Sequence, residues 1–290
     1  MTLCALELFS GLGGWRLALG DRGRVAAAYD INPHANATYA ANHGVRPLAR
    51  ELATLPAAQL AAWGADTWLM SPPCQPYCRM GRLRGLEDPR SAAFLHLMDL
   101  FDVLPPRHLL LENVPGFLDS DAHRLLSDRL RRHGLQAVVI SLCPTRFGIP
   151  NQRPRLYVAA SHRALAVPPL PTAPPMPLGP YLDPEEDSGL YLDAALVARH
   201  GPGLDLVGPG DTRSACFIGG YGQRLVGAGS FLRTPRGIRR FSPAEIARLM
   251  GLPGDFHFPD GVSRLQQYKL LGNGLSIPVA AWVAAHLVPD

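Results

Sequence analysis

The strongest candidate for a reactive side chain is the cysteine at position 74, within the run SPPCQPYCRMG (71–81). A thiolate is a strong nucleophile, the adjacent prolines restrict the backbone, and Arg79 can favour the charged form of the sulfur. A lone cysteine is more often a small buried hydrophobic residue. Cys78 competes for the role but lacks the rigid setting. We therefore predict that Cys74 is a nucleophile.

A carboxylate follows the very apolar run LLLENVPGF (110–118). Glu112 and Asn113 end this expected strand, and desolvation at such a depth raises the pKa of a carboxyl group, which suits proton donation. The plainer alternative is a capping residue or a hydrogen-bonded acid of the core. We predict a catalytic role for Glu112 because it accompanies the other sites.

Two arginines stand two residues apart in GIPNQRPRLYV (148–158). Arg153 and Arg155 would share one face of an entering strand. Paired guanidinium groups can hold a phosphate or a base carbonyl, although two such arginines are more often a solvated edge. They are candidates for substrate positioning.

A glycine-rich turn, FSGLGGW (9–15), follows the first expected strand. Its glycines allow the backbone to approach a ligand closely at a strand-to-helix turn. Position 16 is arginine where a dinucleotide fingerprint requires glycine. Asp30 ends the second expected strand, where an acid can bind ribose hydroxyls, although it could also cap a helix. Together the turn and Asp30 favour a cofactor that contains adenosine.

The elements expected to position these groups alternate between apolar strands and helices. This order predicts an α/β fold with a doubly wound, mostly parallel sheet, in which ligands bind at the carboxyl ends of the strands. The expected strands are 4–9, 25–31, 66–70, 108–114, 136–143 and 155–161, and the expected helices are 12–20, 33–42, 91–104 and 123–133.

The pattern changes after residue 162. The proline-dense stretch 167–184 cannot form a regular helix or a central strand, so we expect a linker. A glycine-rich region with strand-like pieces SACFI and SFLRT follows, and helices resume with a capping box at Ser242. The sequence predicts a catalytic domain of 1–162 plus 241–290 and a small target-recognition lobe at 163–240.

Composition narrows the class of protein. Hydrophobic residues make up 47% and charged residues 18%, as in globular proteins. The five cysteines form no C-x-x-C pair, so we expect reduced thiols, no metal site and a cytoplasmic location. No apolar run is long enough to cross a membrane, and no signal peptide is evident. A net charge of +4 permits a polyanionic partner, and nothing indicates the oligomeric state.

The motifs, taken in order, resemble the cytosine-5 methyltransferase family. FSGLGG, PPCQ, ENV, the R-x-R of QRPR and a terminal GNGLSIPVA occur in the order typical of that family. The resemblance implies a Rossmann-like fold that binds S-adenosyl-L-methionine, and methyl transfer to carbon 5 of cytosine through a Cys74–carbon 6 adduct. The stretches 71–82, 216–232 and 242–259 are most similar to the branch that methylates transfer RNA.

The resemblance also implies roles for individual residues. Glu112 would contact ring nitrogen 3 and the exocyclic amine of the base, while Arg153 and Arg155 would position the cytosine and the nucleophile. Pro73 and Gln75 would shape the catalytic loop. The expected cofactor-binding residues are Phe9, Ser10, Gly11, Gly13, Asp30, Glu51, Pro73 and Asn273. The expected substrate-binding residues are Gln75, Arg79, Asn113, Cys216 and Phe217.

Alternatives differ in the polymer and in the class of protein. Duplex DNA is a close second substrate, but the lobe at 163–240 is short for reading base edges in a major groove, which favours recognition of a preformed RNA shape. A catalytically inactive binding protein is disfavoured because the expected catalytic residues are present. A nicotinamide oxidoreductase is disfavoured by Arg16.

Overall fold

The structure is a computed structural model that describes residues 2–73, 85–184 and 187–287. The chain forms two compact units. Unit 1 comprises Met1–Leu142, Pro154–Pro169 and Ala280–Asp290, and unit 2 comprises Cys143–Arg153 and Leu170–Val279. The predicted division, 1–162 plus 241–290 against 163–240, remains a prediction about the functional domains; the compact units differ from it chiefly because residues 241–279 fold with unit 2.

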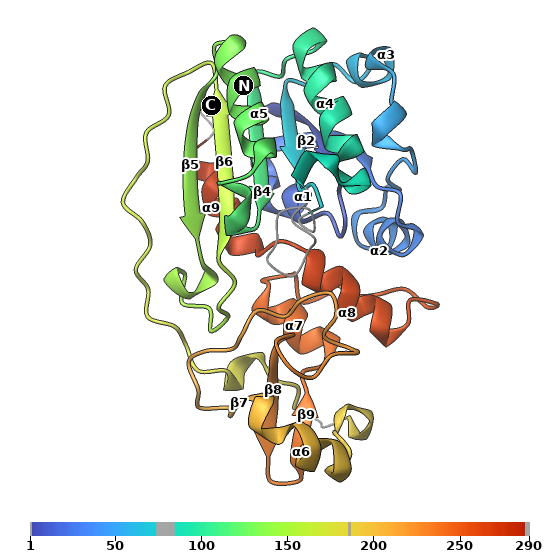
Figure 1. The fold of residues 1–290 in the computed structure, drawn as a ribbon, viewed down its shortest axis with the longest axis vertical. Coiled ribbons are helices and arrows are strands. Elements are labelled where there is room, and N and C mark those ends of the chain that lie inside the picture. The colour runs from blue at the N-terminus through green and yellow to red at the C-terminus, as the bar shows by residue number, and fades with distance from the viewer. Residues whose placement is uncertain (1, 74–84, 185–186, 288–290) are drawn as a thin grey trace. The chain divides into compact units, whose positions relative to one another are not determined.

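Unit 1 is built on a six-stranded sheet with the order β2-β1-β3-β4-β6-β5 (Figure 1). Its strands pair in parallel from β2 to β4, and β6 is antiparallel to both β4 and β5. The predicted α/β fold with a mostly parallel sheet is therefore confirmed. The strands are β1 (Leu3–Leu8), β2 (Gly23–Tyr29), β3 (Thr67–Met70), β4 (His108–Asn113), β5 (Gln136–Leu142) and β6 (Arg155–Ser161).

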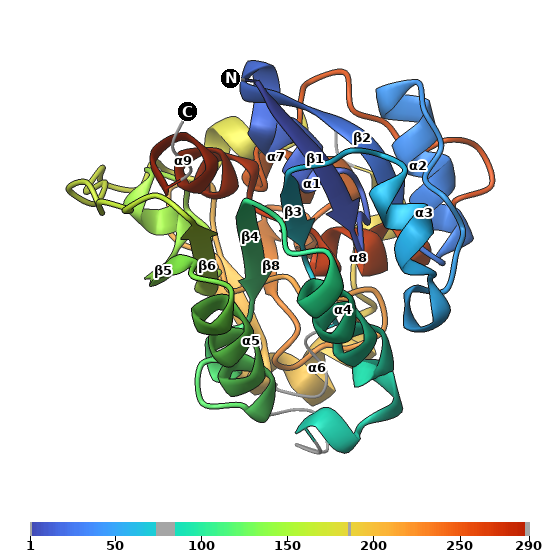
Figure 2. The ribbon, with the colours of Figure 1, turned by 90° about the horizontal axis from the view of Figure 1, so that it is seen from above.

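Helices flank this sheet. Figure 2 shows α4 and α5 on the same side of it, and on the opposite face Trp15 of α1 packs edge-on against Tyr157 of β6, with ring centroids 6.3 Å apart. The four helices predicted within this unit are present, and the short α3 was not predicted. The helices are α1 (Gly14–Leu19), α2 (Pro33–His43), α3 (Ala57–Ala61), α4 (Ala92–Val103) and α5 (Asp121–Arg132).

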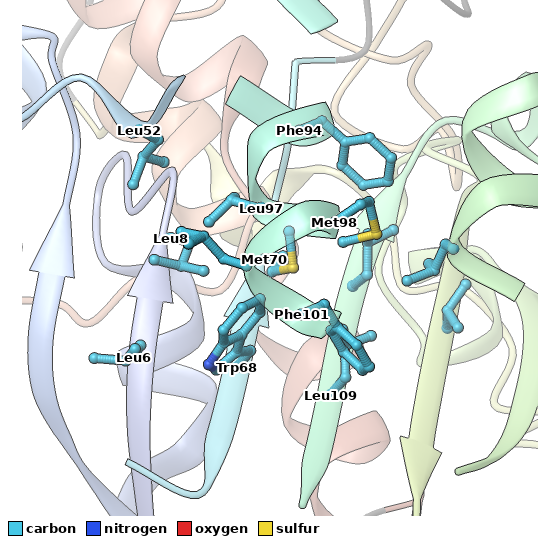
Figure 3. Packing of buried hydrophobic residues seen from close by; sticks show 14 of the residues in the cluster. Leu6, Leu8, Leu52, Trp68, Met70, Phe94, Leu97, Met98, Phe101 and Leu109 are labelled. Atoms are coloured by element: carbon cyan, nitrogen blue, oxygen red, sulfur yellow. The ribbon is translucent and has the colours of Figure 1, made fainter. Parts of the chain in front are cut away.

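The main hydrophobic core lies between the sheet and α4. Successive strand side chains point to opposite faces, so every second residue of a strand contributes to one core. Figure 3 shows Phe94, Leu97, Met98 and Phe101 of α4 facing the strand residues. The buried strand residues of this cluster include Leu6, Leu8, Trp68, Met70, Leu109, Leu111, Leu156 and Val158. This packing fixes α4 against the sheet and holds the strand ends in a defined register.

Unit 2 contains a small sheet with the order β7-β8-β9 and several helices. The predicted strand-like piece SFLRT is β8, whereas SACFI forms only an isolated bridge between Ala215 and Gln152. The segment SACFI does not extend this pairing into a strand, because the backbone N–H of Ala215 donates to the Ser230 hydroxyl. The strands are β7 (Asp205–Val207), β8 (Ser230–Thr234) and β9 (Gly237–Arg240), and the helices are α6 (Ala194–His200), α7 (Pro243–Leu249) and α8 (Arg264–Asn273).

The beginning of α7 follows its sequence signals closely. Ser242 accepts the backbone N–H of Glu245, and the Glu245 side chain accepts the N–H of Ser242, which completes the predicted capping box. Glu245 also forms a buried ion pair with Arg239 at 2.7 Å. The last helix, α9 (Ile277–Leu287), was predicted at 277–288. In the described part of the chain, no helix combines the length and the apolar character needed to cross a bilayer.

Candidate active site

The sheet brings several predicted residues of unit 1 to one edge. Strands β1 to β4 are parallel, so Phe9, Asp30, Ser71 and Asn113 all lie at or just beyond their carboxyl ends. Strand β6 is antiparallel, so its first residue, Arg155, lies at this same edge. An edge of this kind is where ligands bind in open α/β sheets.

Glycine geometry defines the turn after β1. Gly11 and Gly13 have positive φ angles of 52° and 80°, and Phe9 has a φ of 60°, which is uncommon for a residue with a side chain. A Cβ atom added at Gly13 would lie 2.2 Å from Nε2 of His43. Only glycine therefore fits at position 13, whereas nothing lies within 4 Å of a Cβ added at Gly11.

Asp30 holds this turn against the end of β2. Its Oδ2 accepts the backbone N–H of Gly11 at 2.8 Å, and its Oδ1 accepts that of Asn32 at 2.8 Å. Burial raises the pKa of Asp30 above its usual range. The cap of α2 is Asn32, which accepts the N–H groups of His34 and Ala35. Asp30 is thus not the helix cap that the sequence left open as an alternative.

The residues at this turn suit a polar ligand such as the ribose of an adenosine cofactor. The hydroxyl of Ser10 is buried and has no hydrogen-bond partner among the described residues. An acid at the end of the second strand offers acceptors for ribose hydroxyls. Glu51 is exposed, and its carboxylate accepts the N–H of Ala53 at 3.3 Å, so its expected contact with adenine stays a prediction.

The backbone that leads to Cys74 is held from two sides. Trp15 Nε1 donates to the Met70 carbonyl at 3.2 Å and to the Ser71 hydroxyl at 3.0 Å. Asn113 Nδ2 donates to the carbonyl of Pro72 at 3.1 Å. Pro73 follows and is exposed. The predicted residues Cys74, Gln75, Cys78 and Arg79 lie outside the described residues.

Glu112 and Arg155 form an ion pair at the same sheet edge. Arg155 Nε lies 3.1 Å from Glu112 Oε1, and the two side chains are 14% and 9% exposed. Glu112 is opposite Tyr157 in the β4–β6 register, so Arg155, two residues earlier, projects on the same face. The ion pair fixes the orientation of the Glu112 carboxylate, and proton donation by Glu112 stays a prediction.

Arg153 does not share this environment. Its guanidinium is in unit 2, where it donates to the backbone carbonyls of Phe217, Gly272 and Gly274. Arg153 and Arg155 therefore have different hydrogen-bond partners, and the boundary between the two compact units falls between them. Their predicted role in positioning the substrate stays a prediction. Asn273 and the Cys216–Phe217 segment are also in unit 2.

One buried residue that supports this site and was not predicted is Glu7, the penultimate residue of β1. It is fully buried and accepts the N–H groups of Trp15 and Arg16 and the hydroxyl of Tyr39. It thereby fixes the start of α1, from which Trp15 reaches the segment before Cys74. The signal was a single acid inside the apolar run CALELF.

Glu7 makes stability depend on pH. Burial raises the pKa of Glu7 from 4.5 to about 7. Because the folded state holds this proton more tightly than the unfolded state, protonated Glu7 adds to the free energy of unfolding. This contribution is fully present below pH 4.5 and is lost as pH rises toward 7. The free energy of unfolding should fall by an amount on the order of 3 kcal/mol. Urea unfolding at several pH values should show a smaller fall for Glu7→Gln.

Asp21→Asn is the matched control, because Asp21 is an exposed carboxylate in the same unit. It should keep the pH dependence of the parent protein. Parallel stability curves for the parent and Glu7→Gln would contradict the assignment.

No cluster of three or more metal-ligating side chains occurs among the residues that the structure describes. The polar groups at the sheet edge are instead a carboxylate–guanidinium pair, an aspartate at a glycine turn and backbone carbonyls. This set can bind and orient an organic cofactor and a base.

Comparison with known proteins identifies the family. Residues 3–177 and 214–288 match the C-5 cytosine-specific DNA methylase family. A tRNA (cytosine(38)-C(5))-methyltransferase of Schizosaccharomyces pombe is 32% identical, covering 99% of this chain and 97% of the relative. The human enzyme of the same name is 29% identical, covering 96% and 97%.

A solved structure agrees with this result. A methyltransferase of Entamoeba histolytica, EhMeth, superimposes with a TM-score of 0.92 at 29% identity and covers 99% of this chain and 98% of its own. The α/β fold with its mostly parallel sheet agrees with this likeness. The chain belongs to the C-5 cytosine-specific DNA methylase family.

Proposed function

We propose that this protein methylates carbon 5 of a cytosine in transfer RNA, at the position called cytosine 38 in its relatives, with S-adenosyl-L-methionine as the methyl donor. One observation carries the choice of RNA. The S. pombe tRNA enzyme is 32% identical over 99% of this chain, whereas a DNA (cytosine-5)-methyltransferase of Dictyostelium discoideum is 26% identical over the same share. The higher identity to the tRNA enzyme favours RNA.

Cys74 supplies the nucleophile in this proposal. Carbon 5 of cytosine is a poor nucleophile, and addition of a thiolate at carbon 6 forms a sulfur–carbon bond and converts the ring into an enamine. When bound, S-adenosyl-L-methionine supplies a methyl group activated on a sulfonium sulfur. Once carbon 5 carries the methyl group, its proton passes to water, the ring double bond re-forms and Cys74 departs as thiolate.

Glu112 and Arg155 orient and polarise the base. In this proposal the Glu112 carboxylate accepts the exocyclic amine N–H of the base, and a proton shared between Glu112 and ring nitrogen 3 favours attack at carbon 6. Arg155 fixes one oxygen of that carboxylate through the 3.1 Å contact. A preoriented charge in a site with little water costs no reorganisation during the reaction.

Cofactor contacts in unit 1 come from the turn after β1 and from the end of β2. Phe9, Ser10, Gly11 and Gly13 form the turn, and Asp30 holds it by the Gly11 N–H. Asp30 also offers acceptors for the ribose. The buried hydroxyl of Ser10 supports a ligand at this position, since it has no other partner among the described residues.

The test compares methyl transfer from labelled S-adenosyl-L-methionine to matched substrates. An unmodified tRNA transcript with cytosine at position 38 should be methylated, and the same transcript with uridine there should not. The target base must be unstacked to react, which costs a few kcal/mol less where it is already unpaired, as in a loop. A 20-base-pair duplex DNA of matched cytosine content serves as the second substrate. Incorporation into DNA alone would refute the proposal.

DNA is the second candidate, because the family pattern that matches the chain is that of a DNA methylase. Contacts that read base edges in a major groove contribute about 1–3 kcal/mol each and need a surface that enters the groove. The proline-dense stretch 167–184 contains no α-helix or strand. This favours an RNA whose shape presents the base.

A further inference from the structure

Arg153 is almost completely buried in unit 2, with 3% of its surface exposed. Its Nη1 donates to the carbonyl of Phe217 at 3.0 Å, and its Nη2 donates to the carbonyls of Gly272 and Gly274 at 3.0 and 2.6 Å. Nη1 also lies 3.4 Å from the sulfur of Cys216. The guanidinium group is thus occupied by protein atoms from two separate segments.

The first of these segments is 216–219, and the second is the end of α8 with the Gly272–Gly274 turn. Their backbones touch: a Cβ atom added at Gly272 would lie 2.1 Å from the nitrogen of Gly219 and 2.3 Å from the carbonyl carbon of Ile218. No larger residue fits at position 272 without separating the segments. Asn273 lies within this contact, since its Oδ1 would be 3.3 Å from a Cβ at Gly219.

The position of Arg153 has a simple electrostatic basis. The last carbonyl groups of a helix have no partner within the helix and carry partial negative charge. Two of the carbonyls that Arg153 binds, those of Gly272 and Gly274, lie at the end of α8. A planar guanidinium presents several N–H donors in a fixed fork, so it can satisfy them and the Phe217 carbonyl together.

We infer that Arg153 is a positioning residue that joins the Cys216–Gly219 segment to the Asn273 turn, and that it acts on methyl transfer through them without touching the base. The inference rests on the proposed function and on the roles that the family resemblance implies, in which Asn273 binds the cofactor and Cys216 and Phe217 contact the substrate. It separates the two arginines of the R-x-R motif: Arg155 pairs with Glu112, whereas Arg153 organises unit 2.

Amide hydrogen exchange tests the tether without using activity. The variants are Arg153→Lys, which keeps the charge but loses the planar fork, and Arg153→Gln. The reporters are the amides of Ile218 and Gly274, which are bonded to Ala228 and Leu271. Both amides should exchange about tenfold faster in the two variants, because each segment loses a charge-assisted hydrogen bond. In the same two variants, the affinity for S-adenosyl-L-methionine, measured by calorimetry, should also fall about tenfold.

Arg239→Lys is the matched control. Arg239 is also a buried arginine of unit 2, but its partners are Glu245 and the carbonyl of Arg240. At a temperature where all the proteins are folded, this variant should leave the exchange at Ile218 and Gly274 and the cofactor affinity within about twofold of the parent.

A different pattern overturns the inference. If Arg153→Lys lowers kcat while both amides and the cofactor affinity are unchanged, Arg153 acts on the base directly. If exchange rises equally in Arg153→Lys and Arg239→Lys, the effect is general loss of stability. Failure of the proposed function is distinguishable, because a parent protein that neither binds the cofactor nor methylates tRNA still reports on the tether through its exchange rates.

Discussion

Replacing Cys74 with alanine should abolish methyl transfer, with kcat at least about 10⁴-fold lower than in the parent protein. Without the thiolate, carbon 6 receives no electrons, and carbon 5 has no enamine from which to attack the methyl donor. Binding of S-adenosyl-L-methionine should persist, since the turn after β1 and Asp30 do not depend on the thiol. The measurement is single-turnover transfer of labelled methyl to the tRNA transcript, with cofactor affinity measured in parallel.

The control is Cys78→Ala, which removes the other thiol of the same run and should methylate like the parent. A trapped adduct gives a second readout. If position 38 carries 5-fluorocytosine, fluorine cannot leave as the proton does, so the sulfur–carbon bond should persist as a protein–RNA species on a denaturing gel. Cys74→Ala should form none. A Cys74→Ala protein that methylates normally would remove Cys74 from the mechanism.

The second large effect is expected at the Glu112–Arg155 pair. Glu112→Gln should lower kcat by about 10²–10⁴-fold, because the neutral amide stabilises the activated ring poorly. Its stability should change little, since the amide can still accept a hydrogen bond from Arg155. Arg155→Met should lose similar activity and about 3 kcal/mol of stability, because it leaves the carboxylate buried without its partner.

A double-mutant cycle separates these contributions. Glu112→Gln combined with Arg155→Met should recover part of the lost stability, with a coupling energy of about 1–3 kcal/mol in urea unfolding, but no activity. Cofactor affinity should stay within about twofold in all three variants. Additive stability losses would show that the ion pair is not coupled in solution. Active Glu112→Gln protein would place the activating group elsewhere.

Sequence reasoning predicted the sheet well because local signals and burial agree there. The expected strands 4–9, 25–31 and 108–114 correspond to β1, β2 and β4, so Phe9, Asp30 and Asn113 lie at the carboxyl edge of the sheet. The capping box at Ser242 was predicted correctly for the same reason, since it depends only on residues close together in the chain. By contrast, α8 was not predicted, although Ser263 and Gln266 form a second capping box, because its apolar periodicity is weak.

The amino-acid sequence by itself determined the family, the succession of strands and helices along the chain and the candidate residues for chemistry, since motifs and hydrophobic periodicity are local properties. Tertiary structure alone decided how those side chains are used. Arg153 and Arg155 are two residues apart, yet one binds carbonyls of unit 2 and the other binds Glu112. Glu7 stands out in the sequence as an acid within an apolar run, but its partners Trp15 and Tyr39 are set by the fold. Hydrogen-bond partners far apart in the chain are chosen by packing, which no spacing of residues encodes.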